Sequence, residues 1–76
     1  MTLDRITSNP QLMNGKACIR GMRITVSLIL NLIANGMSKE EIIEEYPSLE
    51  LEDIAQSLQY AAYLAEEEIY PIQKAI

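Results

Sequence analysis

The chain has 76 residues, which predicts a single domain whose small core gains stability from a covalent staple or from a partner. One cysteine and no histidine exclude an intrachain disulfide and argue against a metal site or a cofactor, so oligomerisation is the staple that we expect. The formal net charge is −5, no apolar run could span a bilayer, and the first ten residues do not resemble a signal peptide, which predicts a cytoplasmic protein without a membrane partner.

Residues 1–25 predict a small β element. Ile6–Ser8 is a short β-favouring run, and two further brief strands are expected at Ala17–Arg20 and Arg23–Thr25. Gly21 between these two strands has the freedom at positive φ that a tight turn needs. Strands this short are not stable alone, so we expect the element to lie on helices or to pair with another chain.

The first helix is predicted over residues 26–35. Ser27, Asn31 and Asn35 fall four apart and form one polar stripe, whereas every other position up to Ala34 is apolar. A helix of this kind is buried almost all round, which is more than a chain of this size readily covers. We therefore expect it to form the core of a homodimer or of a higher homo-oligomer. Its candidate core and dimer residues are Leu28, Ile29, Leu30, Leu32 and Ile33.

The second helix is predicted over residues 39–46. Ser38 and Glu41 have the spacing of a capping box, with Ser38 as the N-cap and Glu41 at the third helical position. Gly36 lies where a glycine cap for the preceding helix belongs, and Pro47 ends the second helix.

The third helix is predicted over residues 51–69, with the acids Glu50, Glu52 and Asp53 at its N-terminal end. Its apolar positions recur with a period near 3.6 and are Leu51, Ile54, Ala55, Leu58, Ala61, Ala62, Ala65 and Ile69. The fold class is therefore mainly α. We expect a helix-turn-helix-like, homeodomain-like three-helix bundle over residues 26–69, with the β element packed on it and a tail at residues 70–76.

Catalysis is not expected. Glu40, Glu41, Glu44, Glu45 and Glu66–Glu68 fall on solvent faces by their spacing. A catalytic pair of carboxylates needs burial to separate its two pKa values. Cys18 has no histidine to activate it, so a small core residue is the better interpretation. The sequence also contains no glycine-rich phosphate loop.

The charges are divided between the two halves of the chain. Residues 1–35 carry four basic side chains against Asp4, a net charge of +3, whereas residues 36–76 have a net charge of −8. The four cations are candidate nucleic-acid contacts, namely Arg5, Lys16, Arg20 and Arg23. The alternative is that Arg20 and Arg23 pair with carboxylates of the acidic helices, within one chain or across a dimer. The acids at the start of the third helix make that helix a poor reader of DNA.

A longer pattern runs through residues 6–62: ITSNP, then GKACIRGMRITV, then ANGMSKEEI, then YPSLELEDIAQSLQYAA. This arrangement closely resembles the bacterial domain-of-unknown-function family 433. The chain departs from the family pattern at a few positions. Ala17 and Thr25 stand where proline is usual, Met22 stands where threonine is usual, and Glu50 stands where a threonine often caps the last helix.

The resemblance implies a homeodomain-like three-helix protein and a role as a VapB-like antitoxin encoded beside a PIN-like nuclease toxin. In that role the protein binds the toxin and can repress the shared operon through double-stranded operator DNA. The family motif carries over to Gly15, Lys16, Cys18, Arg20, Gly21 and Arg23.

A PIN-like nuclease must attract RNA phosphates, so an acidic helix with an apolar tip could occupy its basic cleft. The candidate toxin contacts are Glu66, Glu67, Glu68, Tyr70, Ile72 and Ile76. The alternative for residues 70–76 is a frayed terminus. The alternative for the whole chain is a structural or adaptor homodimer that makes no nucleic-acid contact.

Overall fold

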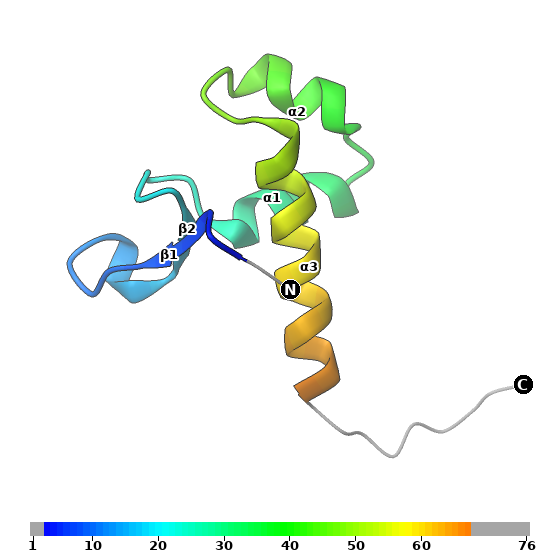
Figure 1. The fold of residues 1–76 in the computed structure, drawn as a ribbon. Coiled ribbons are helices and arrows are strands. Elements are labelled where there is room, and N and C mark those ends of the chain that lie inside the picture. Colours follow the sequence, from blue (N-terminus) through cyan, green and yellow to red (C-terminus); the bar gives the residue numbers. More distant parts are fainter. Residues whose placement is uncertain (1–2, 68–76) are drawn as a thin grey trace, which may run out of the picture.

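Two short strands and three α-helices follow one another along the chain (Figure 1). The structure is a computed structural model and describes residues 3–67. The elements are β1 (Ile6–Ser8), a 3₁₀ turn (Met13–Gly15), β2 (Ala17–Ile19), α1 (Val26–Ala34), α2 (Lys39–Glu45) and α3 (Leu51–Glu67). This order confirms the mainly helical class with a small N-terminal β element, and the helices begin at the predicted residues.

The two strands pair in an antiparallel sheet. Ile6 lies opposite Ile19 and Ser8 lies opposite Ala17. The prediction of a further strand at Arg23–Thr25 is wrong, because only one isolated bridge, between Cys18 and Thr25, continues the sheet. Two physical reasons account for this. The chain turns sharply through left-handed backbone after Ile19, and Thr25 already serves as the N-cap of α1.

Both ends of α1 are capped. The Thr25 hydroxyl oxygen accepts a hydrogen bond from the Leu28 backbone N–H at 3.0 Å. At the other end, the Gly36 N–H donates to the Ile33 carbonyl at 2.9 Å, and the next N–H donates to the Leu32 carbonyl at 3.0 Å. This pair of bonds is a Schellman motif, which requires the positive φ of +93° that Gly36 adopts. The predicted glycine cap is therefore confirmed.

The capping box of α2 is also confirmed. The Ser38 hydroxyl accepts from the Glu41 N–H at 3.1 Å, and the Glu41 carboxylate accepts from the Ser38 N–H at 2.8 Å. The Ser38 hydrogen bonds lower the pKa of the Glu41 carboxyl. The box holds α2 in the place where Ile42 is fully buried.

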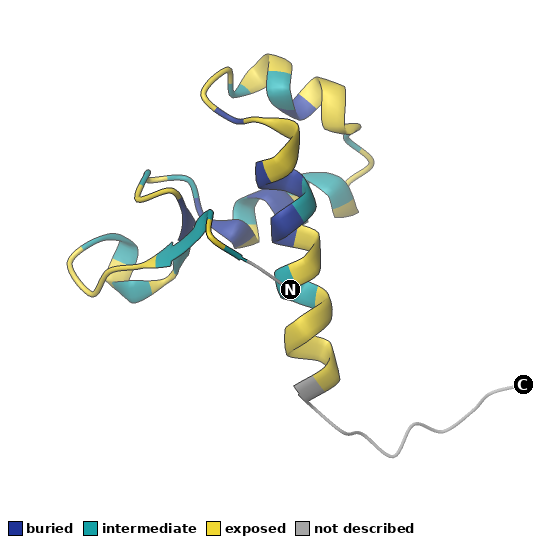
Figure 2. Cartoon of the chain, in the orientation of Figure 1, coloured by how far each residue is buried: buried dark blue, intermediate teal, exposed yellow. Residues whose placement is uncertain are grey.

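The core takes at least one side chain from β2, from each helix and from the connection before α3 (Figure 2). Its fully buried apolar residues are Ile19, Val26, Ile29, Ile42, Leu49 and Ile54. Cys18 is buried beside them, which confirms its interpretation as a small core residue. The β element therefore lies on the helices, one of the two arrangements that its short strands allow.

The polar stripe of α1 is confirmed, because Ser27, Asn31 and Asn35 are all exposed. Within one chain the rest of the helix is less buried than its composition suggests. Only Val26 and Ile29 are fully buried. The other predicted core and dimer residues are half-buried, namely Leu28, Leu30, Leu32 and Ile33. The homodimer that would cover them stays a prediction.

The apolar repeat of α3 does not coincide with its core side. The core side consists of Asp53, Ile54, Gln56 and Ser57, of which only Ile54 is apolar. Leu51 and Leu58 are exposed instead, and the C-terminal half of α3 projects beyond the other helices with mostly exposed side chains (Figure 2). The apolar period of α3 therefore does not mark its buried side. Polar side chains take the core side because they bind the β element.

Within residues 3–67, no helix combines the length and the apolar character that crossing a membrane requires.

Replacing Ser38 with alanine removes half of the capping box and leaves the Glu41 N–H without its partner. We expect the free energy of unfolding to fall by about 1 kcal/mol. Urea unfolding followed by circular dichroism measures this change. Lys39→Ala, at the exposed first position of the same helix, is the matched control and should shift the free energy by less than about 0.5 kcal/mol. Equal effects of the two substitutions would contradict a role for the box.

Candidate functional site

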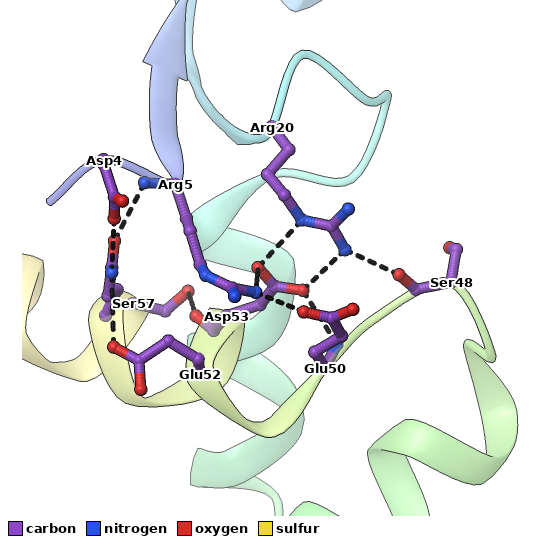
Figure 3. Close-up of polar contacts among 9 residues, drawn as sticks. Asp4, Arg5, Arg20, Ser48, Glu50, Glu52, Asp53 and Ser57 are labelled. Atoms are coloured by element: carbon purple, nitrogen blue, oxygen red, sulfur yellow. Dashed lines mark hydrogen bonds and ion pairs between the residues drawn. The ribbon is translucent and has the colours of Figure 1, made fainter.

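A buried carboxylate near the start of α3 gathers the polar side chains of the N-terminal region (Figure 3). Asp53 is the third residue of α3 and is fully buried. Its Oδ1 accepts from Arg5 Nη1 at 3.0 Å and from Arg20 Nε at 3.1 Å. Its Oδ2 accepts from Arg20 Nη2 at 2.8 Å and from the Glu50 backbone N–H at 2.8 Å. Four donors thus saturate one carboxylate, which is how a buried charge becomes tolerable.

Each arginine also has a second anchor. Arg5 Nη1 lies 2.6 Å from Glu50 Oε1, and Arg20 Nη2 donates to the Ser48 carbonyl at 2.7 Å. The Arg20 backbone N–H donates to the Arg5 carbonyl at 2.8 Å, so the two guanidinium groups approach Asp53 from adjacent segments. Arg20 itself has a φ of +47°, a left-handed conformation that costs energy outside glycine. The ion pair with Asp53 stabilises that conformation.

A second set of bonds lies one turn along α3. The side chain of Gln56 makes both bonds. Its Oε1 accepts from the Arg5 backbone N–H at 2.9 Å, and its Nε2 donates to Asp4 Oδ1 at 2.8 Å. The Ser57 hydroxyl donates to the Asp53 carbonyl at 2.9 Å. These residues and the pairs above form what we call the Asp53 cluster, which consists of Asp4, Arg5, Arg20, Ser48, Glu50, Glu52, Asp53, Gln56 and Ser57.

The cluster is suited to holding the fold together and not to acid–base chemistry. Burial acts to raise the pKa of Asp53, but the hydrogen bonds from Arg20, the Glu50 backbone and Arg5 outweigh it and hold that pKa below its ordinary value. The hydrogen bond to Asp53 raises the pKa of Arg20. A carboxylate with four donors and a lowered pKa is a weak base, so it has no means of taking a proton from a substrate.

The structure separates the four predicted nucleic-acid contacts into two groups. Arg5 and Arg20 belong to the Asp53 cluster, so the alternative interpretation, pairing with an acidic helix inside the chain, is confirmed for Arg20, and Arg5 pairs in the same way. Lys16 and Arg23 are exposed and make no ion pair within residues 3–67. The side chains of Arg5 and Arg20 keep 27% and 36% of their surface exposed, but Asp53 and Glu50 neutralise their charges.

Lys16 and Arg23 lie at opposite ends of β2. Lys16 directly precedes the strand, and Arg23 follows the turn after it. Two cations on separate segments can contact separate phosphates of a nucleic-acid backbone.

The polar residues at the start of α3, where a recognition helix would read DNA, already make contacts within the chain. Asp53, Gln56 and Ser57 are buried, whereas Glu50 and Glu52 stay exposed while they bond to Arg5 and Gln56. The prediction that α3 is a poor recognition helix therefore has a structural reason in addition to its charge.

An apolar groove of about 520 Å³ lies beside α3 where the helix leaves the core. It is lined by Lys16, Ala17, Val26, Ser27, Leu30, Tyr60, Ala61 and Leu64. Leu64 is 45% exposed, although it continues the line of α3 that faces the core nearer the N-terminus. The core simply ends before α3 does, so this part of the helix meets solvent.

Of the predicted toxin contacts, Glu66 is exposed near the end of α3, and Glu67 is the last residue of that helix. Glu68, Tyr70, Ile72 and Ile76 lie outside the described residues. The exposed large apolar side chains of the described chain all belong to α3 and are Leu51, Leu58, Tyr63 and Leu64. The sequence placed Leu51 and Leu58 in the apolar repeat of this helix but did not indicate that they would be exposed.

Asp53, Gln56 and Ser57 are the residues whose role the sequence analysis missed. The available signal was the third helical position of Asp53, where a carboxylate can accept the N-cap N–H. Nothing in the spacing indicated that Arg5 and Arg20 would be its partners, because these residues lie 48 and 33 positions away. In the part of the chain that the structure describes, no group of carboxylates and cysteine could hold a metal ion.

The chain is similar to known proteins in its sequence and in its fold. The profile of a family described as "Protein of unknown function (DUF433)" matches residues 6–61. The uncharacterized protein y4eO of Sinorhizobium fredii is 36% identical over 56 residues, which are 74% of this chain and 25% of that protein. The crystal structure of a DUF433 member protein from Anabaena variabilis has a TM-score of 0.78 at 28% identity, covering 84% of this chain and 63% of that one. The chain thus spans a quarter of the first relative and under two thirds of the second.

Replacing Asp53 with asparagine should destabilise the fold, because two arginines lose their counter-charge and one side-chain amide donor faces them. We expect a loss of about 2 kcal/mol at pH 7, below the value for fully buried pairs because the arginine heads are partly exposed. Chemical unfolding measures the loss. Glu44→Gln, which neutralises an exposed acid of α2, is the control and should have little effect.

The pH dependence of stability should report the same interaction. Because the folded pKa of Asp53 is lowered, its contribution is present above the unfolded pKa of about 3.9 and is lost as the pH falls through the folded value. The difference in unfolding free energy between the native chain and Asp53→Asn should therefore shrink below about pH 4. A difference that stays constant down to pH 2 would remove the Asp53 ion pairs as its cause.

Proposed function

The chain belongs to the DUF433 family, a family of unknown function, and from that premise we propose that it is the antitoxin of a type II toxin–antitoxin pair. In this proposal it binds and neutralises a PIN-like nuclease encoded beside its own gene. The resemblance in the sequence motivates the role, and the surface of α3 supports it. The chain is not an enzyme in this proposal.

The observation that carries the proposal is the exposed C-terminal half of α3. This helix contains no basic residue, has Glu66 and Glu67 at its end, and exposes large apolar side chains where it leaves the core. An exposed apolar surface that is bordered by charges of one sign is common in protein-binding sites. A nuclease that binds RNA phosphates has to present cations, so its cleft offers both the opposite charge and a place for apolar contacts.

A second contact, with operator DNA, belongs to the same proposal. Lys16 and Arg23, which are exposed and make no ion pair within residues 3–67, are the cations that supply it. The acidic α3 carries the opposite charge, so the two partners are assigned to different parts of the chain.

The alternative function, a structural or adaptor homodimer, is favoured by one observation. The half-buried apolar residues of α1 would gain burial from a second copy. A homodimer is also compatible with the antitoxin role, and only the absence of both the nuclease and the DNA contact would favour the adaptor function.

The antitoxin role predicts rescue of cells that express the neighbouring nuclease. We expect the native chain to restore growth and the double reversal Glu66→Lys plus Glu67→Lys to lose rescue, because it places cations against a basic cleft. Colony counts and co-purification of the two proteins measure the outcome.

The matched control is Glu44→Lys plus Glu45→Lys, which makes the same change of charge on exposed positions of α2. This variant should rescue growth like the native chain. If both variants rescue equally, the acidic end of α3 does not bind the nuclease. If the native chain itself neither rescues growth nor co-purifies, the antitoxin role is wrong.

The DNA contact predicts a particular dependence on salt. With duplex from its own promoter, Lys16→Ala plus Arg23→Ala should bind more weakly and lower the magnitude of the salt slope by about 2, since each phosphate contact contributes about 0.9. Fluorescence anisotropy across salt concentrations measures the slope. Lys39→Ala, an exposed cation at the start of α2, is the control. An unchanged slope would take Lys16 and Arg23 out of the DNA contact.

A further inference from the structure

A second apolar face of α3 runs along the side that does not face the core. Its members alternate in steps of four and three residues, which is the spacing of a coiled-coil seam. They are Leu51, Ala55, Leu58, Ala62 and Ala65, and we call them the α3 seam. Over this length an α-helix rises about 21 Å, or four turns.

The seam is open to solvent in the folded chain. Leu51 is 57% exposed and Leu58 is 39% exposed, while Ala62 and Ala65 are exposed and Ala55 is half-buried. A different side of the helix faces the core. Asp53, Gln56 and Ser57 lie on that side, and they belong to the Asp53 cluster. Repacking cannot turn the seam inward without breaking that cluster. The seam is therefore a face for another molecule.

The charges beside the seam indicate which molecule it is. Glu52, Gln59 and Glu66 follow Leu51, Leu58 and Ala65 by one residue each and so border the seam on its exposed side. The α3 helix of a second copy would fit poorly on the seam. An antiparallel pair of these helices brings Glu52 of one copy towards Glu66 of the other, and the two negative charges repel each other. A parallel pair of α3 helices contains no cation for any of these acids, since α3 has no lysine or arginine.

The sizes of the seam residues add a second condition. Three of the five are alanines, which let a neighbouring helix approach closely and leave holes for large side chains. A partner helix therefore needs bulky apolar residues in its own seam. It needs lysine or arginine in the positions that flank the seam, where they meet Glu52 and Glu66.

We propose that the α3 seam binds a basic amphipathic helix of the partner protein, with bulky apolar side chains seated on its alanines and cations against its acidic border. The inference rests on the proposed function for the identity of that protein, the nuclease, but its chemistry follows from the seam alone. It also places a partner contact along four turns of α3, in addition to the acidic end of that helix.

A synthetic peptide tests the seam without the nuclease. The probe is an amphipathic helix of about 20 residues, long enough for four turns, with leucine in its seam and lysine in the flanking positions. A second peptide has glutamate in place of each lysine. Fluorescence anisotropy with the full chain should show binding of the lysine peptide and none of the glutamate peptide.

Two variants of the full chain locate the binding. Ala62→Arg puts a bulky cation into the centre of the seam at an exposed position and should weaken binding of the lysine peptide by about tenfold or more. Asn31→Arg adds the same charge to an exposed position of α1 and should bind like the native chain. Circular dichroism of both variants checks that they are folded.

Three results would overturn the inference. Equal binding to Ala62→Arg and Asn31→Arg would mean that the peptide responds only to net charge. Absence of binding by the lysine peptide, or binding of both peptides, would mean that the seam does not select a basic helix. Self-association of the native chain that Ala62→Arg abolishes, measured by sedimentation, would assign the seam to a second copy. Because no nuclease is present, these results are independent of the rescue experiment.

Discussion

The interaction on which this structure depends is the salt bridge of one buried carboxylate with two arginines. Asp53 accepts four hydrogen bonds from three separate segments: the residue before β1, the turn after β2 and the start of α3. The sheet it anchors has two strands of three residues, which have no independent stability. The apolar core contains six fully buried side chains, so the cluster supplies much of what joins the β element to the helices. Its geometry also stabilises Arg20 in a left-handed conformation.

The ion pairs within the chain determine which charged residues are free to bind other molecules. Arg5 and Arg20 neutralise Asp53 and Glu50 inside the chain, which leaves Lys16 and Arg23 as the exposed cations of the described N-terminal region. Asp53 at the start of α3 is likewise paired and buried, whereas Glu52 and Glu66 are exposed. The exposed cations belong to the β element and Glu52 and Glu66 belong to α3, so a basic protein and an anionic nucleic acid would be attracted to different elements of the chain.

The third helix has more apolar surface than the core can cover. A chain of this size forms a small core, and α3 at 17 residues is longer than the other helices that pack against it. Its core side is partly polar because it binds the β element, so its leucines and alanines point elsewhere. The helix is therefore both a structural support, through its first two turns, and an exposed face, along its seam and its C-terminal half. This division is the physical basis for assigning partner contacts to α3.

The sequence by itself determined the elements that depend on neighbouring residues. The capping box at Ser38, the glycine cap at Gly36 and the polar stripe of α1 all involve contacts within a few positions, and the family motif adds the fold class. Only the tertiary structure decided which side of α3 is buried and where Arg5 and Arg20 point, because those outcomes depend on partners 33 to 48 positions away. An apolar repeat shows that a helix has a face to bury, but it does not say whether its own core or another molecule will cover it. In this chain the ion pairs of Asp53 determine which side of α3 is buried. The period of the apolar residues contains no information about those ion pairs.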